Sequence, residues 1–287
     1  MDPIIAFLAA AIRIGTPLAW AALGETLAER AGVINLSVEG SMLSGCLAAA
    51  AVSGVTGNPW LGLVAGVAAG ALVAALFALL AVGARTDQII AGTALTLAAV
   101  GLTGLAFRRL VAIPSSGLQG SVATLPWPAA PTVAVLAAGL GIWWYLSRTT
   151  GGLRLRAVGE SADAARAAGV PARRVQAVAV IVGGAMAGMG GATLVLAQVG
   201  TFAERMTAGR GFIAIAIVVL GRWQPLGVLV AALGFGAANA LQFAFQAMGL
   251  DVPYQFFLML PYLLAVAALT GLGGRLRAPA GLGKTIG

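Results

Sequence analysis

The chain has 287 residues, of which 60% are hydrophobic and 9% are charged, and its mean hydropathy is +0.98. Soluble domains carry about 25% charged residues, so the composition excludes a soluble fold and indicates that lipid is the main solvent. The net charge is +8, but no basic patch is interleaved with stacking aromatic residues, which argues against nucleic-acid binding. Histidine is absent, which excludes histidine nucleophile and general-base arrangements and most zinc sites.

Nine apolar segments predict membrane helices, because about 20 apolar residues are needed to cross the hydrocarbon core. In chain order they are Ile4–Leu23, Val33–Val52, Pro59–Val82, Ile89–Leu105, Ala129–Leu146, Val175–Val199, Gly211–Leu220, Leu226–Met248 and Pro253–Leu272. The first follows Met1-Asp2-Pro3 without a basic stretch, so it is expected to remain a helix and not to be cleaved as a signal. We therefore predict an all-α fold, a polytopic membrane protein with about 8–10 transmembrane helices in one domain over residues 1–287.

The seventh segment, Gly211–Leu220, is shorter than the others. Ten helical residues rise only about 15 Å, half of the hydrocarbon thickness. The segment therefore either extends back through Ala203–Gly209 or forms half of a broken helix.

Basic residues predict the orientation, since arginine and lysine are retained in cytoplasmic loops. The loop Arg148–Arg174 holds six arginines and two acids, and the tail over residues 273–287 holds Arg275, Arg277 and Lys284. Both are expected in the cytoplasm, and the four segments between them are consistent with this. The same reasoning places the N-terminus and residues 106–128 outside, which leaves Arg108 and Arg109 on the side that disagrees with the rule.

Glycine accounts for 41 residues, and several occur four residues apart on predicted helices. Such spacing puts small residues on one helix face and lets membrane helices approach closely. These positions are Gly62, Gly66 and Gly70 on one helix, and Gly184 and Gly188 on another.

Two pairs of segments are typical of an inverted repeat. Asn58-Pro59 and Gln224-Pro225 each open a long apolar helix, and each follows a glycine-interrupted segment. In the predicted topology the pairs run in opposite directions, and interrupted helices at matching positions point to a substrate path in transporters.

Polar residues interrupt the start of the second segment, from Glu29 to Gly40. One interpretation is a helix break that lines a translocation path, with Asn35, Ser37 and Glu39 as polar groups. The other is an ordinary interfacial helix start, with Glu29 and Arg30 at the lipid headgroups. Arg13 lies within the first segment and is expected either to pair with Glu39 or to reach a subunit contact.

The loop between the fifth and sixth segments encodes a helix of about two turns. Ser161 is a good N-cap, Asp163 suits the first turn, and Gly169 can end the helix just before Pro171. The small alanine face of this helix could dock into a groove on a partner. The alternative is a solvated surface helix flanked by arginines.

Two further features suggest a path, each with a structural alternative. The glycine–arginine pairs that bracket Phe212 could permit a helix break or could anchor a short spanning helix. Asn239, Gln242 and Gln246 lie on one helix face and could line a cavity or bond neighbouring helices.

Several ordered motifs resemble those of permease subunits of nucleoside and simple-sugar ABC importers, in the broader group of ribose and branched-chain amino-acid permeases. The resemblance is carried by residues 29–43, 87–95, 156–169 and 211–221, and it spans roughly residues 15–272. It implies that the chain moves a solute without hydrolysing ATP, is not an enzyme and binds no cofactor, because ATP is bound by a partner ATPase.

The resemblance also implies where the functional residues lie. The coupling helix that contacts the ATPase would include Gly159, Glu160, Ser161, Asp163, Ala164, Ala165 and Gly169. Together with the polar positions above, the candidate pathway residues are Asn35, Ser37, Glu39, Gln88, Thr93, Phe212, Asn239 and Gln242.

The expected partners are a second related permease or a second copy of this chain, two cytoplasmic ATPase domains and an extracytoplasmic binding protein, often a lipoprotein. The expected location is the bacterial inner membrane, with a cytoplasmic C-terminus. The sugar-type relatives carry an additional N-terminal helix, so the short form favours nucleosides. A ribose-type permease and an ion-coupled secondary transporter, with Glu39 as its acid, are the alternatives.

Overall fold

The computed structural model describes residues 3–113, 116–247, 259, 263 and 278–284. The secondary structure of these residues is helical, with no strand among them. The helices are α1 (Pro3–Arg30), α2 (Val38–Thr56), α3 (Pro59–Ala78), α4 (Gln88–Val111), α5 (Ala130–Arg148), α6 (Thr150–Glu160), α7 (Ala162–Ala167), α8 (Ala172–Thr193), α9 (Arg210–Leu220) and α10 (Pro225–Ala247). Two π-helical turns, η1 (Leu79–Gly83) and η3 (Leu194–Val199), continue α3 and α8.

Seven helices in the described part of the chain are long and apolar enough to span a membrane. Eight of the nine predicted segments coincide with helices, and Pro253–Leu272 lies outside the described residues. The all-α prediction is confirmed. The short segment is half of a broken helix, because Gly209 has a φ of 82° and α9 begins only at Arg210. It does not extend back through Ala203–Gly209.

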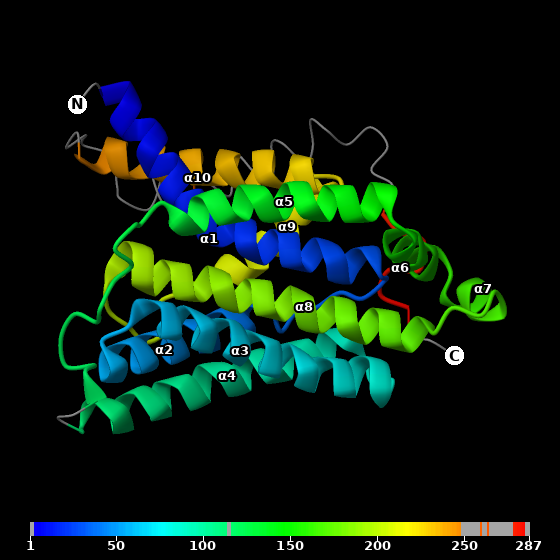
Figure 1. Cartoon of the computed structure of the whole chain (residues 1–287), viewed down its shortest axis with the longest axis horizontal. Coiled ribbons are helices and arrows are strands. Elements are labelled where there is room, and N and C mark those ends of the chain that lie inside the picture. Colours follow the sequence, from blue (N-terminus) through cyan, green and yellow to red (C-terminus); the bar gives the residue numbers. More distant parts are fainter. Residues whose placement is uncertain (1–2, 114–115, 248–258, 260–262, 264–277, 285–287) are drawn as a thin grey trace.

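The helices α1 and α8 lie side by side in the middle of the molecule (Figure 1). On one side of this pair lie α2, α3 and α4, and on the other lie α5, α9 and α10. The short helices α6 and α7 and the last described residues are at one end, beside the C-terminal end of α1. This is the end that carries the arginine-rich loop.

Glycine contacts set the distance between α3 and α8. A Cβ atom added at Gly70 would lie 2.6 Å from the Cα of Gly188, and one at Gly66 would lie 2.8 Å from the Cβ of Ala192. Real side chains do not tolerate such distances, so the two backbones can approach only because these residues are glycines. The predicted close packing of these glycines is confirmed.

Arg108, one of the two arginines that disagree with the positive-inside rule in the predicted topology, has a partner. Arg108, in the last turn of α4, donates two hydrogen bonds of 2.8 and 3.1 Å to the carboxylate of Glu204. These bonds hold the pKa of the Glu204 carboxyl below its ordinary value. The charge of Arg108 is therefore compensated by Glu204, so this arginine is weak evidence for the side of the membrane on which it lies.

The glycine packing gives a test with two opposite outcomes. We expect Gly70→Ala to destabilise the protein by about 1–3 kcal/mol, because the methyl group overpacks the α3–α8 contact. Gly101→Ala is the matched control, since a Cβ there would meet nothing within 4 Å. It should stabilise α4 by about 0.5–1 kcal/mol through helix propensity. Thermal unfolding in detergent measures both, and equal midpoints for the two variants would contradict the packing argument.

Candidate functional site

A non-helical stretch, residues 31–37, joins α1 to α2 and is called the polar connection. Gly32, with a φ of 88°, turns the chain away from α1. The backbone N–H of Ile34 then donates to Gln88 at the start of α4 (2.9 Å), and Thr96 donates to the carbonyl of Leu36 (2.9 Å). Thr96 lies eight residues beyond Gln88, or about 12 Å along α4. The polar connection therefore runs into the spanning region before α2 begins.

Asn35 and Ser37 hold the polar connection in its shape. The Asn35 side-chain oxygen accepts hydrogen bonds from the backbone N–H (3.0 Å) and the hydroxyl (2.5 Å) of Ser37. The Asn35 backbone N–H donates to the carboxylate of Glu25 (2.8 Å). Both Asn35 and Ser37 are fully buried. Non-helical backbone at membrane depth requires such internal partners, because lipid supplies none.

Two acids of α1, one helical turn apart, are buried beside this stretch. Glu25 binds Asn35, and Glu29 accepts a 2.5 Å hydrogen bond from the indole N–H of Trp223. The carbonyl of Trp223 in turn accepts from Arg30 (2.7 Å). Each glutamate is only 1% exposed, so the interpretation that placed Glu29 at the lipid headgroups is wrong. Within the described residues, no group of three or more acidic, cysteine or histidine side chains could hold a metal ion.

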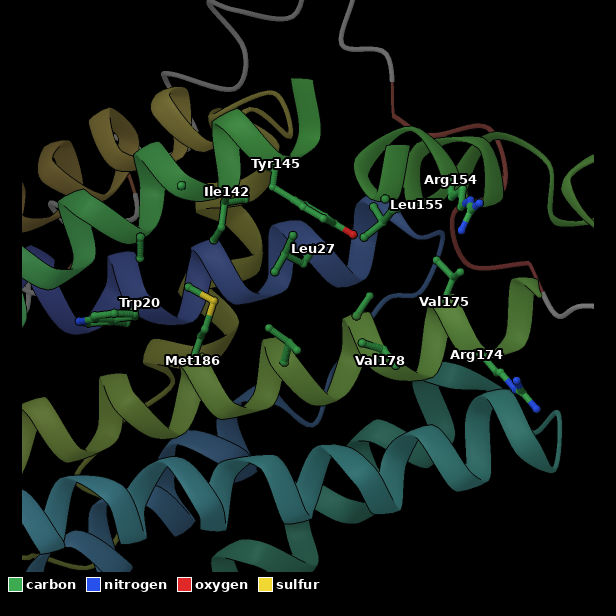
Figure 2. Close-up of a pocket in the computed structure, with 15 residues that line it drawn as sticks. Trp20, Leu27, Ile142, Tyr145, Arg154, Leu155, Arg174, Val175, Val178 and Met186 are labelled. Atoms are coloured by element: carbon green, nitrogen blue, oxygen red, sulfur yellow. The ribbon is translucent and has the colours of Figure 1, made fainter. Parts of the chain in front are cut away.

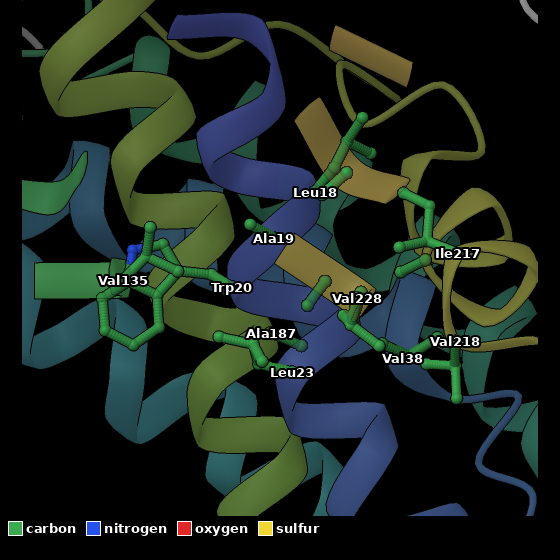
Figure 3. Close-up of a cluster of buried hydrophobic side chains, with 14 of the residues drawn as sticks. Leu18, Ala19, Trp20, Leu23, Val38, Val135, Ala187, Ile217, Val218 and Val228 are labelled. Atoms are coloured by element: carbon green, nitrogen blue, oxygen red, sulfur yellow. The ribbon is translucent and has the colours of Figure 1, made fainter. Parts of the chain in front are cut away.

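Glu39, in the first turn of α2, binds the N-terminal end of α9. Its carboxylate accepts hydrogen bonds from the Thr207 hydroxyl (2.6 Å) and from the backbone N–H groups of Gly209 (2.9 Å) and Gly211 (2.6 Å). A carboxylate is stabilised there by free N–H groups and by the helix dipole. The N-terminal ends of α2 and α9 therefore meet at Glu39, whereas the inverted repeat itself stays a prediction. Figure 3 shows the apolar contact beside this point, where Val38 lies next to Val218.

The predicted pairing of Arg13 with Glu39 is wrong. Arg13 is exposed on α1, and its backbone carbonyl accepts a hydrogen bond from Gln198. The carboxylate oxygens of Glu39 are already bound by three donors from the segment that leads into α9. Because these three donors bind both carboxylate oxygens of Glu39, this side chain has hydrogen-bond partners without an arginine.

The other predicted pathway residues do not form one group with the polar connection. Thr93 is exposed on α4 and donates to the carbonyl of Ile89 (2.6 Å). Phe212 is 42% exposed and follows Gly211, which binds Glu39. Asn239 donates to a carbonyl of its own helix and Gln242 is buried, both on α10, which packs against α1, α5 and α9. The side chain of Gln246 lies outside the described residues.

The predicted short helix is confirmed as α7. The hydroxyl of Ser161 accepts from the backbone N–H of Ala164 (3.2 Å), and Gly169 ends the turn with a φ of 82°. Ala165 faces inward and is 5% exposed, whereas Ala164 is exposed. The face that is free for a partner is therefore the one that carries Ala164.

The preceding helix, α6, was not predicted. Glycines at positions 151, 152 and 159 lower its helix propensity. Its signals were the N-cap Thr149, which accepts from Gly152 (3.0 Å), and the apolar pair Leu155 and Val158, which is buried.

The end of α6 contacts the polar connection directly. A Cβ at Gly159 would lie 2.9 Å from the carbonyl carbon of Arg30, so this glycine permits the contact. Residues of the C-terminal tail join the two: Gly281 donates to the carbonyl of Gly159 (2.8 Å), and Gly283 donates to that of Gly32 (3.1 Å). Gln176 of α8 adds a bond to the carbonyl of Ala31 (3.0 Å). The end of α6 is therefore joined by main-chain contacts to the point where α1 ends.

The carboxylate at the start of α9 gives a test of the site. We expect Glu39→Gln to destabilise the protein by about 1.5–3 kcal/mol, because a charged acceptor is lost and the new amide group faces N–H donors. Thermal unfolding in detergent measures the loss. Arg13→Gln is the control and should leave the midpoint unchanged. An equal loss of stability in both variants would instead support a pairing of Arg13 with Glu39.

Comparison with known proteins identifies relatives over almost the whole chain. Residues 7–269 match the family described as branched-chain amino acid transport system, permease component. The guanosine ABC transporter permease protein NupQ of Bacillus subtilis is 33% identical, over 92% of this chain and 90% of that protein. The nucleoside ABC transporter permease protein NupC of Lactococcus lactis is 30% identical, over 92% and 91% of the two chains.

A third relative comes from an archaeon. TsgC13 of Haloferax volcanii, named as a candidate glucose ABC transporter permease, is 39% identical over 85% of this chain and 78% of that protein. No solved structure matches the chain. The family match and the seven apolar helices confirm the resemblance seen in the sequence. This chain therefore belongs to the permease family of ABC transporters and is a multi-pass membrane protein.

Proposed function

We propose that this permease carries a nucleoside across the membrane by alternating access. The observation that supports the nucleoside is that the guanosine and nucleoside permeases align over at least 90% of both chains. The relative named for glucose is 39% identical and supports a hexose as the second candidate. An ion-coupled secondary transporter, the remaining alternative, is disfavoured because the relatives over almost the whole chain are named as permeases of ABC transporters.

The proposed assembly is an importer in which other subunits supply the energy. Two cytoplasmic ATPase domains bind and hydrolyse ATP, so this chain is not catalytic and needs no cofactor of its own. An extracytoplasmic binding protein delivers the solute, and a second related permease or a second copy completes the path. The membrane is the bacterial inner membrane, and the loop over residues 148–174 and the tail over residues 273–287 face the cytoplasm. Their arginines support this orientation.

The proposed coupling element is residues 159–169, with α7 as the contact for the ATPase. A push on α7 reaches Gly159 at the end of α6, and from there the carbonyl of Arg30 and the polar connection. Arg30 and Glu29 hold Trp223, which lies in the turn between α9 and α10. One displacement would therefore move both α2 and α9.

The contacts also divide the proposed pathway residues by role. Three of them, Asn35, Ser37 and Glu39, form hydrogen bonds within the chain. We assign these residues to holding the start of α2 in place beside α1 and α9. Thr93 and Phe212 have exposed side chains and are available to meet a solute. Gln88 anchors the polar connection to α4, and Asn239 and Gln242 belong to a separate surface on α10.

The exposed face of α7 gives a test of coupling. We expect Ala164→Trp to reduce both ATPase association and solute uptake by about tenfold, because a bulky side chain costs roughly 1–3 kcal/mol in a packed interface. Pull-down of the ATPase and uptake in cells expressing the importer measure the two effects. Ala68→Trp, at an exposed position on α3, is the control. Survival of both association and uptake in Ala164→Trp would refute the coupling assignment.

Competition distinguishes the two candidate solutes. In cells that express the complete importer, we expect uptake of labelled guanosine to be blocked by excess uridine or adenosine and not by excess glucose. Labelled glucose should not accumulate, because a site built for a nucleobase leaves polar groups unpaired with a hexose. Glucose uptake that nucleosides do not inhibit would replace the nucleoside by a hexose and leave the permease assignment intact.

A further inference from the structure

An apolar groove lies between α5 and α8, with α1 as its floor, and is called the α5–α8 groove. Its volume is about 630 Å³. Figure 2 shows Trp20 at one end, and Tyr145, Leu155 and Val175 toward the other. The α6 residues that line the α5–α8 groove precede Gly159, the residue through which the proposed coupling route leaves α6.

The α5–α8 groove opens sideways, toward the lipid. Val178 and Val182, on its α8 edge, are 60% and 41% exposed, and Tyr145, on its α5 edge, is 37% exposed. Both edges belong to helices that are long and apolar enough to span the membrane. A lipid molecule can therefore enter from the bilayer without crossing water.

One end of the α5–α8 groove carries positive charge. Arg154 of α6 and Arg174 of α8 line it at the end near Val175 (Figure 2). Among the described residues, neither guanidinium has a hydrogen bond or an ion pair. The two arginines lie at the arginine-rich end of the molecule, where the headgroups of the cytoplasmic leaflet would be.

The length of the α5–α8 groove suits a lipid chain. Arg174 and Met186 are twelve residues apart on α8, which is about 18 Å of helix. This length is more than half of the hydrocarbon thickness of about 30 Å, so an acyl chain that enters at the arginine end can follow the groove through one leaflet.

We propose that the α5–α8 groove binds one anionic phospholipid of the cytoplasmic leaflet. The negatively charged headgroup lies at the end of the groove that Arg154 and Arg174 border from its two sides, and an acyl chain runs along the apolar floor toward Trp20. Basic pockets between membrane helices on the cytoplasmic side are suited to anionic lipid headgroups, and arginine forms paired hydrogen bonds with phosphate.

Native mass spectrometry of the full-length protein in detergent tests the charge. The probes are phosphatidylglycerol and phosphatidylcholine with identical acyl chains. We expect phosphatidylglycerol to bind more tightly, and the variant Arg154→Gln with Arg174→Gln to lose about fivefold in affinity for each arginine. The control, Arg85→Gln with Arg173→Gln, removes the same charge from exposed arginines that do not line the α5–α8 groove. Equal binding of the two lipids, or an equal loss in the control, would overturn the proposal.

A second variant tests the groove itself. Gly141 lines it, and a Cβ there would meet nothing within 4 Å, so Gly141→Leu should fold and fill the space. We expect this variant to lose the bound phosphatidylglycerol, whereas Gly234→Leu, an equally open position on α10, should keep it. Thermal unfolding midpoints confirm that both variants fold.

Two further measurements separate a lipid from other occupants. Glycerol 3-phosphate, a headgroup without a chain, should not bind at the same concentrations, and its binding would indicate a free phosphate site instead. A cysteine introduced at Val178 should not crosslink to another permease subunit in the purified importer. A crosslinked dimer would show that protein covers the groove and would refute the lipid site.

Discussion

The organisation of this permease depends on one buried carboxylate. Glu39, in the first turn of α2, binds the backbone N–H groups at the start of α9, so that the N-terminal ends of the two helices meet in one buried place. The N–H groups at the start of α9 could not be left unpaired in lipid, because a free backbone donor there costs several kcal/mol. The interaction thus lets the short helix α9 begin within the spanning region, where it packs against α2.

The second constraint is the close approach of backbones where side chains are missing. Gly159 touches the carbonyl of Arg30, and Gly281 and Gly283 bond to Gly159 and Gly32. A contact between main chains has little freedom to adapt, because no rotamer can absorb a displacement. The arginine-rich end of the molecule is therefore joined rigidly to the polar connection.

Much of the fold could be read from the sequence, because hydrophobic length and glycine spacing are local signals. The start of α3 at Pro59, the end of η3 at Val199 and the capping of α7 by Ser161 follow from local signals, whereas α2 begins five residues later than the predicted Val33. Partnerships between distant segments could not be read in the same way. The sequence predicted the pairing of Arg13 with Glu39 from their opposite charges alone. The donors to Glu39 are mainly backbone N–H groups of glycines, and no side chain in the sequence indicates that these groups bind a carboxylate.

The buried acids show the same limit. Glu25 and Glu29 stand at the end of an apolar segment, where acids usually meet water, and only the tertiary fold brings Asn35 and Trp223 to them. Thr93 and Thr96 are equivalent in type and lie less than one turn apart, yet only Thr96 faces the polar connection. The choice between them depends on helix rotation, which packing decides and composition does not.

The long separation of these partners in the sequence has a consequence for biogenesis. Glu29 and Trp223 are 194 residues apart, and Glu39 and Gly211 are 172 residues apart. When α1 and α2 leave the ribosome, the donors to Glu29 and Glu39 have not yet been synthesised, whereas Asn35, the partner of Glu25, has. Glu29 and Glu39 can reach their hydrogen-bond partners only after α9 and the turn that follows it have been made. These two contacts therefore belong to the last stage of folding, and the two helices that carry them must enter the membrane before their acids are paired.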